Sequence, residues 1–543
     1  MKKWGIITSL VLASSILFSQ KTSVIDNAAI GMKVFNANQA FLAGDINKAL
    51  KLYTEANTAK PNDGSILYHI GQCHYVVGEM EEALKYLQRA EEVDTDANEN
   101  IHLTLGLAYQ QEDQVDNALA EFKRHKRRYS ADPKKLKEDD IDQLIAECVL
   151  AKQMESHPIN VKIRNAGESI NSEYDDKTPS VTADGTILIF TSNRPLHVGK
   201  MDPTQDPNQL FDNVYLCKWD SGKNDWGLSY SIDGDVNQAY VHTACTSISP
   251  DGSTIFLYRN SVHGAAVGGD IYISKKSKKA KWGEPVSVGK PVNSSYYEDG
   301  ACLSPDGNTL YFVSERPGGY GGGDIYKAER ISREEWAKPE NLGPVVNSSY
   351  DEGAPFLAPD GHTLFFSSNG HNTMGGYDIF KTSMNDSGKW ATPVNLGYPI
   401  NTVNNEKNFT LAADARTAYF SSDRPGGIGK RDIYIADLSN YSVLATNSNS
   451  QPKGYSILRG QITDHKGGPV KEANVTVSDS SGAKVANITT GSDGMYFITL
   501  KGNERYKIKI SSRGNKSSTK AILLPNSTLG TFTMEQDFTL EKE

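Results

Sequence analysis

A set of repeated ionisable positions offers the clearest chemistry in this sequence. Five short segments each begin with asparagine and carry an ionisable side chain five residues later. These side chains are Asp176, His242, Glu298, Glu352 and Glu406, which follow Asn171, Asn237, Asn293, Asn347 and Asn401. If the segments repeat one structural unit, symmetry places the five side chains in a ring around a common axis. Carboxylate oxygens in such a ring suit a hard cation, and they would also attract a basic peptide segment.

The same ring has an alternative explanation. Crowded carboxylates repel one another, so they need partners if they are to stay ionised. Arg194, Arg316 and Arg424 recur among the repeats and could supply that pairing, as could backbone amides. The sequence leaves both interpretations open: a ring that binds a ligand, or acidic side chains that are neutralised within the fold.

No catalytic or cofactor motif accompanies the ring. The sequence lacks the Gly-x-Ser-x-Gly elbow, the His-Glu-x-x-His metal motif, the P-loop and the dinucleotide fingerprint. Its five cysteines have no metal-ligand spacing, which leaves one disulfide or buried free thiols as interpretations. We therefore expect a protein that is not an enzyme and that uses no cofactor.

The elements that would position the ring are copies of one β-rich unit. Each copy has a tight turn with an aspartate, an apolar run, a glycine-rich stretch and an Asp-Ile-Tyr-like segment. The turn aspartates are Asp184, Asp251, Asp306, Asp360 and Asp414, which are 67, 55, 54 and 54 residues apart. Four short strands per copy at this period predict a five-bladed β-propeller over residues 158–439. The last copy lacks an outer strand, and we expect residues 160–171 to supply it.

The glycine-rich stretches have a structural explanation and a functional one. They read SERPGGYGGGDIY at 314–326 and SSDRPGGIGKRDIY at 421–434. Glycine allows positive φ between two strands, and the following aspartates could accept hydrogen bonds from the loop amides. The aspartates in question are Asp270, Asp324, Asp378 and Asp432. The alternative is a ligand-binding loop, although no phosphate motif is present.

These repeats resemble the WD40-like PD40 propellers, the family that includes the periplasmic propeller of TolB. The resemblance covers about residues 160–438 and is carried by the repeated Pro-Asp-Gly, Ser-x-Arg-Pro-Gly and Asp-Ile-Tyr segments. It implies a propeller that binds partners on one face. A receptor module for peptides or cell-wall fragments is the alternative function that this resemblance implies.

Residues 26–155 have helical periodicity and a repeat of their own. Ala49, Ala83 and Ala118 are 34 and 35 residues apart, with small residues where paired helices would cross. This pattern resembles three tetratricopeptide repeats, which we expect a helix over about 137–152 to cap. Such a stack presents a groove for a protein partner, whereas the alternative is a spacer without a ligand.

The C-terminal part is again β-rich. Residues 440–455 are polar and predict a linker. Residues 456–541 resemble the carboxypeptidase regulatory-like domain, on the strength of Gly460, Gly468-Pro469, Val475 and the segment 490–496. The resemblance implies a small β-sandwich that supports or binds and does no chemistry.

The N-terminus and the overall charge indicate where the protein acts. Two lysines precede an apolar run over residues 4–18, which predicts a signal peptide over residues 1–20, without a lipid anchor or a transmembrane segment. The net charge of -9 argues against nucleic acid as a partner. The basic cluster over residues 123–128 is typical of a solvated helix face.

The order of domains resembles the periplasmic, outer-membrane-associated component of the Bacteroidota type IX secretion system. Members of that family commonly continue into an OmpA-like domain that grips peptidoglycan, and this sequence has none. We therefore expect a multidomain protein: a helical tetratricopeptide solenoid, an all-β five-bladed propeller and a small β-sandwich. Its expected function is that of a periplasmic scaffold for envelope or secretion-machine proteins, bound through the helical groove and the propeller face.

Overall fold

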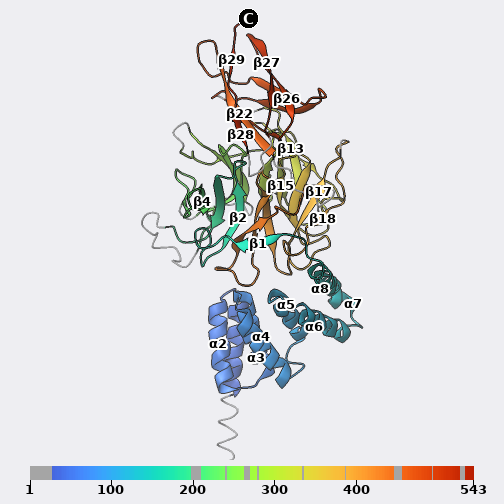
Figure 1. Ribbon diagram of the computed structural model, residues 1–543. Helices are drawn as coiled ribbons and strands as arrows, with labels where there is room; N and C mark the ends of the chain where they lie inside the picture. The colour runs from blue at the N-terminus through green and yellow to red at the C-terminus, as the bar shows by residue number, and fades with distance from the viewer. Residues whose placement is uncertain are drawn as a thin grey trace, which may run out of the picture. The chain divides into compact units, whose positions relative to one another are not determined.

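The computed structural model describes most of the chain. The described residues are 27–196, 210–238, 241–261, 269–277, 281–332, 335–385, 387–444, 455–491, 493–525 and 532–543. They divide into two compact units, Met1–Val149 and Leu150–Glu543. The first is helical and the second is almost entirely β (Figure 1). The predicted signal peptide and most of the predicted linker lie outside the described residues.

The helical unit consists of paired helices. The pairs are residues 27–42 with α2 (Ile46–Ala59), α3 (Gly64–Val77) with α4 (Met80–Val93), and α5 (Ile101–Gln111) with α6 (Val115–Arg128). Close crossing explains the small residues of the repeat. A Cβ at Gly71 would lie 2.7 Å from the Leu87 side chain, and one at Gly106 would lie 2.4 Å from the Phe122 ring. Neither position has room for a larger side chain.

The predicted capping helix is in fact two helices. α7 (Pro133–Glu138) ends before α8 (Ile141–Glu155) begins. The residue between them that precedes α8, Asp140, has a φ of 48°, in the left-handed region that an α-helix excludes. The aspartate that begins α7, Asp132, accepts a hydrogen bond from the Lys135 amide at 3.1 Å. Within the described residues, no helix has the length and apolar character needed to cross a membrane.

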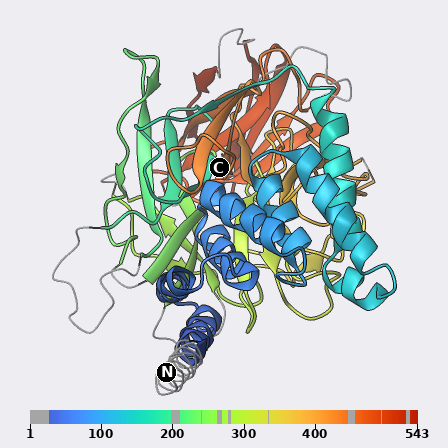
Figure 2. The same cartoon turned by 90° about the horizontal axis from the view of Figure 1, so that it is seen from below.

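The part of the β unit up to Asp437 contains five antiparallel sheets, four of which are each built from one sequence copy (Figures 1 and 2). The first has β2 (Asp176–Val181), β3 (Ile187–Ser192), β4 (Asn213–Asp220), β5 (Asp225–Trp226) and β6 (Tyr230–Ser231). The second has β7 (Val241–Ile248), β8 (Thr254–Ser261), β9 (Asp270–Lys275) and β10 (Val286–Ser287). The third has β11 (Glu298–Leu303), β12 (Thr309–Ser314), β13 (Asp324–Glu329) and β14 (Glu340–Asn341). The fourth has β15 (Glu352–Leu357), β16 (Thr363–Ser368), β17 (Asp378–Ser383) and β18 (Val394–Asn395).

The fifth sheet joins the two ends of this region. It contains β19 (Glu406–Leu411), β20 (Thr417–Ser422), β21 (Asp432–Asp437) and, from the beginning of the region, β1 (Lys162–Asn165). β1 pairs antiparallel with β21, with Lys162 opposite Asp437, which confirms the outer strand expected from residues 160–171. The first strands of the five sheets pack side by side in the order β2, β7, β11, β15 and β19, and β19 packs in turn against β2.

The outermost strands are shorter than the sequence suggests. β10, β14 and β18 have two residues each, and each follows a proline: Pro285, Pro339 and Pro393. Proline has no amide hydrogen to donate to the ladder, so pairing cannot continue through it. A single bridge forms before each proline, at Trp282, Trp336 and Trp390.

The glycine-rich loops turn the chain and also pack closely against neighbouring backbone. A Cβ at Gly321 would lie 1.7 Å from the Tyr350 carbonyl oxygen, and one at Gly375 would lie 2.0 Å from that of Val403. Gly429 is equivalent, at 2.1 Å from the Tyr174 carbonyl oxygen. Each loop thus presses on the backbone that enters the next sheet, where only glycine fits.

The aspartates after these loops accept hydrogen bonds from loop amides, as predicted. Asp324 accepts from the Tyr320 amide at 2.7 Å and from Gly321 at 3.0 Å. Asp378 accepts from Met374, and Asp432 accepts from Ile428 and Gly429. The loop before Asp270 lies outside the described residues.

The last part of the β unit forms two further sheets. In one, β22 (Tyr455–Asp464) pairs with β25 (Met495–Lys501), β28 (Thr533–Glu535) and β29 (Phe538–Leu540). The other has the order β24 (Lys484–Thr489), β23 (Asn474–Ser478), β26 (Arg505–Ser512) and β27 (Asn515–Leu523). Val475, Ile508 and Ile510 belong to the buried core of this part. The Tyr455 amide donates to the Ala413 carbonyl oxygen at 2.7 Å, which ties β22 to the preceding sheets.

Candidate binding sites

The structure places the four predicted carboxylates at equivalent positions. Asp176, Glu298, Glu352 and Glu406 are the first residues of β2, β11, β15 and β19, and at most 1% of each is exposed. Their oxygens are occupied by their own sheets. Glu298 accepts from the Ser294 amide at 2.8 Å, from its hydroxyl at 2.5 Å and from the Ser314 hydroxyl at 2.7 Å. These carboxylates therefore act as internal hydrogen-bond acceptors.

Arginines complete the pairing in three of the sheets. Arg194 lies 2.6 Å from Asp176, Arg316 3.3 Å from Glu298, and Arg424 3.1 Å from Glu406. The same guanidinium groups donate to carbonyl oxygens just before each first strand, those of Ile170, Val292 and Ile400. The contacts are those of the pairing alternative, in which the arginines neutralise the acidic side chains.

The fourth sheet replaces the arginine with a histidine that the repeat alignment misses. His371 Nε2 lies 2.9 Å from the Val346 carbonyl oxygen and 3.9 Å from Glu352. Burial raises the pKa of Glu352, and hydrogen bonds from Ser348 and Ser368 oppose that rise. Burial also raises the pKa of Glu406, although the Arg424 charge opposes it.

His242 does not share the position of the four carboxylates. It is the second residue of β7, and its side chain is one third exposed. Its Nδ1 accepts a hydrogen bond from the Asp212 amide at 3.3 Å, and the Asp212 carboxylate lies 3.7 Å away. Burial alone would raise the pKa of Asp212, but bonding to His242 and the Lys177 charge lower it. Of the five predicted ring residues, the structure thus gives four a common environment.

The structure contains a second charged cluster, which the alignment of the repeats did not predict. Its residues directly follow three of the four carboxylates in sequence. Lys177 and Lys407 directly follow the acidic residues of β2 and β19, and Asp299 follows that of β11. Successive strand residues point to opposite faces, so these side chains leave the sheets on the other side. Their charges reach one another, since Lys177 and Lys407 both act to lower the pKa of Asp299. Burial dominates, however, and that pKa is raised.

Lys407 is the most perturbed cation of this cluster. Burial and the nearby Arg431 lower its pKa to about 8. Its Nζ lies 3.3 Å from the centre of the Tyr377 ring, and this ammonium group makes no hydrogen bond or ion pair with another described residue. Lys177, by contrast, pairs with Asp175 at 3.3 Å and with Asp212 at 3.1 Å. A perturbed lysine beside a buried carboxyl is a common feature of functional sites.

A β-bulge interrupts four of the first strands, two residues after the first residue of each. Thr178, Gly300, Ala354 and Asn408 have φ values of 52°, 62°, 48° and 60°. The pairing register shifts at each of these points. Bulges redirect side chains, which explains how residues next to each other in a strand reach different surroundings. No local sequence signal marks the bulges, since the four residues differ in type.

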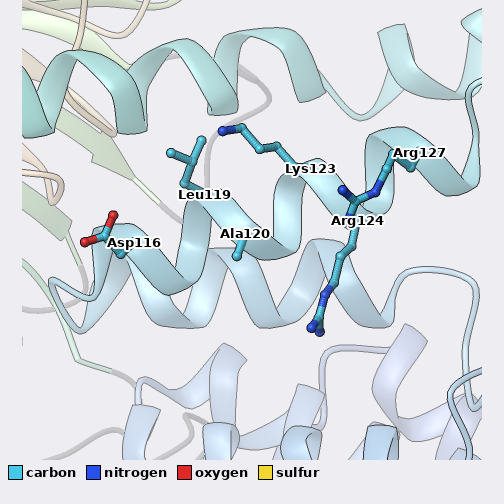
Figure 3. Close-up of a pocket in the computed structure, with 6 residues that line it drawn as sticks. All are labelled: Asp116, Leu119, Ala120, Lys123, Arg124 and Arg127. Atoms are coloured by element: carbon cyan, nitrogen blue, oxygen red, sulfur yellow. The ribbon is translucent and has the colours of Figure 1, made fainter.

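The helical unit offers a separate surface. Phe35 is 58% exposed, Leu42 79% and Val76 51%, and all three belong to the first helices of their pairs. Exposed large apolar side chains on helices of a repeat stack are typical of a protein-binding surface. The second helices carry a different surface, with a shallow groove along α6 (Figure 3). Leu119 and Lys123 point to one side of α6 and Arg124 to the other (Figure 3).

The basic residues of α6 are largely compensated. Arg124 pairs with Glu91 at 3.0 Å and with Glu121 at 2.8 Å, and Lys126 pairs with Asp142 at 2.5 Å. His102 completes a cluster with the same two glutamates, which has the donor types for a metal ion. Because Arg124 and His102 already satisfy both carboxylates, the cluster is explained as an ion-pair network. All five cysteines of the chain are buried, and no disulfide links them.

Comparisons with known proteins identify two parts of the chain. The tetratricopeptide repeat family matches residues 40–102, and the carboxypeptidase regulatory-like domain matches residues 457–541. No curated protein matches the chain. Similar solved structures include the Yersinia enterocolitica type III secretion chaperone SycD with a peptide of the translocator YopD (13% identity, 23% of this chain, 95% of that chain, TM-score 0.21). Another is the TPR2B domain of yeast Sti1 (20% identity, 22% of this chain, 98% of that chain, TM-score 0.20). A third is the Sgt2 TPR domain from Aspergillus fumigatus (17% identity, 24% of this chain, 83% of that chain, TM-score 0.22).

Proposed function

We propose that this protein is a non-enzymatic scaffold that holds protein partners together in the periplasm. Tetratricopeptide repeats suggest an adaptor role in protein–protein interaction. The observation that carries the proposal is the set of exposed apolar side chains on the first helices, Phe35, Leu42 and Val76. A water-exposed Phe and Leu on a rigid repeat stack gain stability only when a partner covers them.

The proposal includes a five-bladed propeller as the second binding module. Its support is the cyclic packing of β2, β7, β11, β15 and β19, together with the sheet that β1 and β21 share. Sharing one sheet between the beginning and the end of this region would close such a ring of sheets. The resemblance to PD40 repeats supports the same architecture.

The location is part of the proposal. The lysine-led apolar run at the N-terminus supports export to the periplasm, and the order of domains supports association with an outer-membrane assembly, such as the type IX secretion machine. Fractionation of cells that produce the chain would test this directly. Recovery with cytoplasmic proteins would contradict the proposed location.

The scaffold function is tested by capture of partners. A tagged chain is purified from envelopes after mild crosslinking, beside a Phe35→Asp/Leu42→Asp variant. We expect outer-membrane or secretion-machine proteins with the parent chain and their loss with the variant. Thr54→Asp/Thr58→Asp adds the same two carboxylates at exposed positions of α2 and is the matched control that should retain them. Equal recovery with all three chains would contradict the role of this surface.

A receptor function is the second candidate, and the charged cluster favours it. Lys177, Asp299 and Lys407 gather charges of both signs from three sheets, as a peptide or a cell-wall peptide fragment would require. Retention of such ligands by the full chain should fall with Lys407→Met and persist with Phe35→Asp. The opposite pattern would assign binding to the helical surface.

A further inference from the structure

One face of the last sheet in the chain gathers cations from two of its strands, β24 and β26. The register places Lys484 of β24 opposite Ser478 of β23, and Ser478 opposite Lys507 of β26. Lys509, two residues further along β26, is opposite Thr476. Residues directly opposite in an antiparallel sheet share a face. Lys484 meets Ser478 across a β-bulge, next to the exposed Val485, and both bulge residues lie on the side of Ser478.

Burial confirms which face this is. Along β26, Tyr506, Ile508 and Ile510 are buried in the core, while Arg505, Lys507 and Lys509 are exposed. Hydroxyl, amide and small side chains fill the positions between the cations on this face. They are Asn474, Thr476, Ser478, Asn487, Ser511, Thr519 and Ala521. The face is therefore polar and basic, in contrast to the opposite face of the same sheet.

The cations of this face are uncompensated. Among the described residues, Lys484, Arg505, Lys507 and Lys509 form no ion pair. The nearby acidic side chains lie in turns and have partners of their own, since Asp479 accepts from the Ser481 and Ala483 amides and Glu504 from the Tyr506 hydroxyl. A chain with a net charge of -9 thus concentrates free positive charge on one sheet.

We propose that this basic face docks on an anionic phospholipid surface. A face without aromatic side chains has no platform on which sugar rings could stack. It also lacks the buried aromatic or arginine anchors and the pockets that dominate protein interfaces. Spread cations with hydroxyl and amide donors between them suit a layer of lipid phosphates. Leu523, which is 54% exposed opposite Arg505, adds an apolar side chain at the rim.

Which membrane this face meets in the cell depends on the envelope location proposed above. The affinity of the face for anionic phospholipid does not depend on that location. The face would hold the chain against a membrane leaflet. Because charge supplies most of the attraction, binding should be moderate and should weaken with salt.

The test uses the full chain and large unilamellar vesicles. Vesicles of phosphatidylcholine with about 30 mol% phosphatidylglycerol are compared with pure phosphatidylcholine by sedimentation, at about 50 and about 300 mM NaCl. We expect binding to the anionic vesicles at low salt and little to the neutral ones. Lys507→Gln/Lys509→Gln should lower the partition coefficient about 25-fold, since each surface cation near an anionic leaflet contributes about fivefold.

The matched control removes two lysines from the same part of the chain but not from this face. Lys466→Gln/Lys471→Gln makes the same change in net charge at exposed turn positions, and it should retain most of the binding. An equal loss with both double variants would overturn the proposal, as would absence of binding at low salt. Stronger binding to polyglutamate than to anionic vesicles would assign the face to an acidic protein and overturn the membrane assignment. None of these results depends on partner capture by the helical unit, so the two proposals fail separately.

Discussion

Replacement of Gly321 by alanine tests how the glycine-rich loops pack. The added Cβ would lie 1.7 Å from the Tyr350 carbonyl oxygen and 3.0 Å from that of Ser348. Both are backbone atoms of the segment that enters β15, so no side chain can rotate away. The clash also disturbs the hydrogen bond from the Gly322 amide to Tyr350, which is 3.2 Å long. We expect a loss of about 3 kcal/mol in the free energy of unfolding, from overpacking and a weakened hydrogen bond.

Urea unfolding followed by tryptophan fluorescence is a suitable assay. All of the tryptophans except Trp4 lie in the sheets of the β unit, so fluorescence reports mainly on that unit. Gly353→Ala is the control, because a Cβ there meets no atom within 4 Å and the backbone is not left-handed. It should change stability by less than about 0.5 kcal/mol. Equal urea midpoints for the two variants would refute the packing argument for the loops.

Three further predictions follow from the carboxylates and their neighbours. Glu298→Gln should lower the free energy of unfolding by about 3 kcal/mol because Arg316 loses its buried partner. Glu352→Gln, beside His371, should lower it by about 1 kcal/mol. The urea midpoints of both variants check this, and equal losses would contradict it. The double variant Glu298→Gln/Glu352→Gln also tests ligand binding. If its melting temperature and its binding of partners are both unchanged, the ring of carboxylates has no role in ligand binding. The folded pKa of Lys407, about 8, lies below the ordinary value of 10.5, so the lysine contributes stability that is present above pH 10.5 and lost as the pH falls through 8. The parent chain should therefore gain up to about 3 kcal/mol relative to Lys407→Met between pH 7 and pH 10, and parallel pH profiles in chemical denaturation would refute this. Ala354→Gly should stabilise the β unit by about 1 kcal/mol because it relieves a non-glycine residue at a φ of 48°, and a lowered melting temperature would contradict that reasoning.

The repeated patterns were readable without the structure because they reflect local requirements. Gly71 and Gly106 are small because a helix crosses each at close range, and that need recurs at every repeat. The aspartates after the glycine-rich loops bond to amides three or four residues away, which is a distance that sequence alone can anticipate. The outer strand contributed by residues 162–165 was predictable because the last copy lacked its counterpart.

The residues that meet at the candidate binding sites could be identified only from the tertiary structure. His371 takes the place of an arginine from a different sequence position, because what matters is reach to the Val346 carbonyl oxygen. Arg431 pairs with Asp175 across 256 residues, and Lys177, Asp299 and Lys407 meet although each belongs to a different copy. The basic face likewise needs Lys484 and Lys507 to flank one strand of a sheet. The sequence by itself determined the elements, since turns and periodicity are local. Strand register, bulges and the order in which sheets pack decided which side chains meet, because those depend on contacts between residues far apart in the chain.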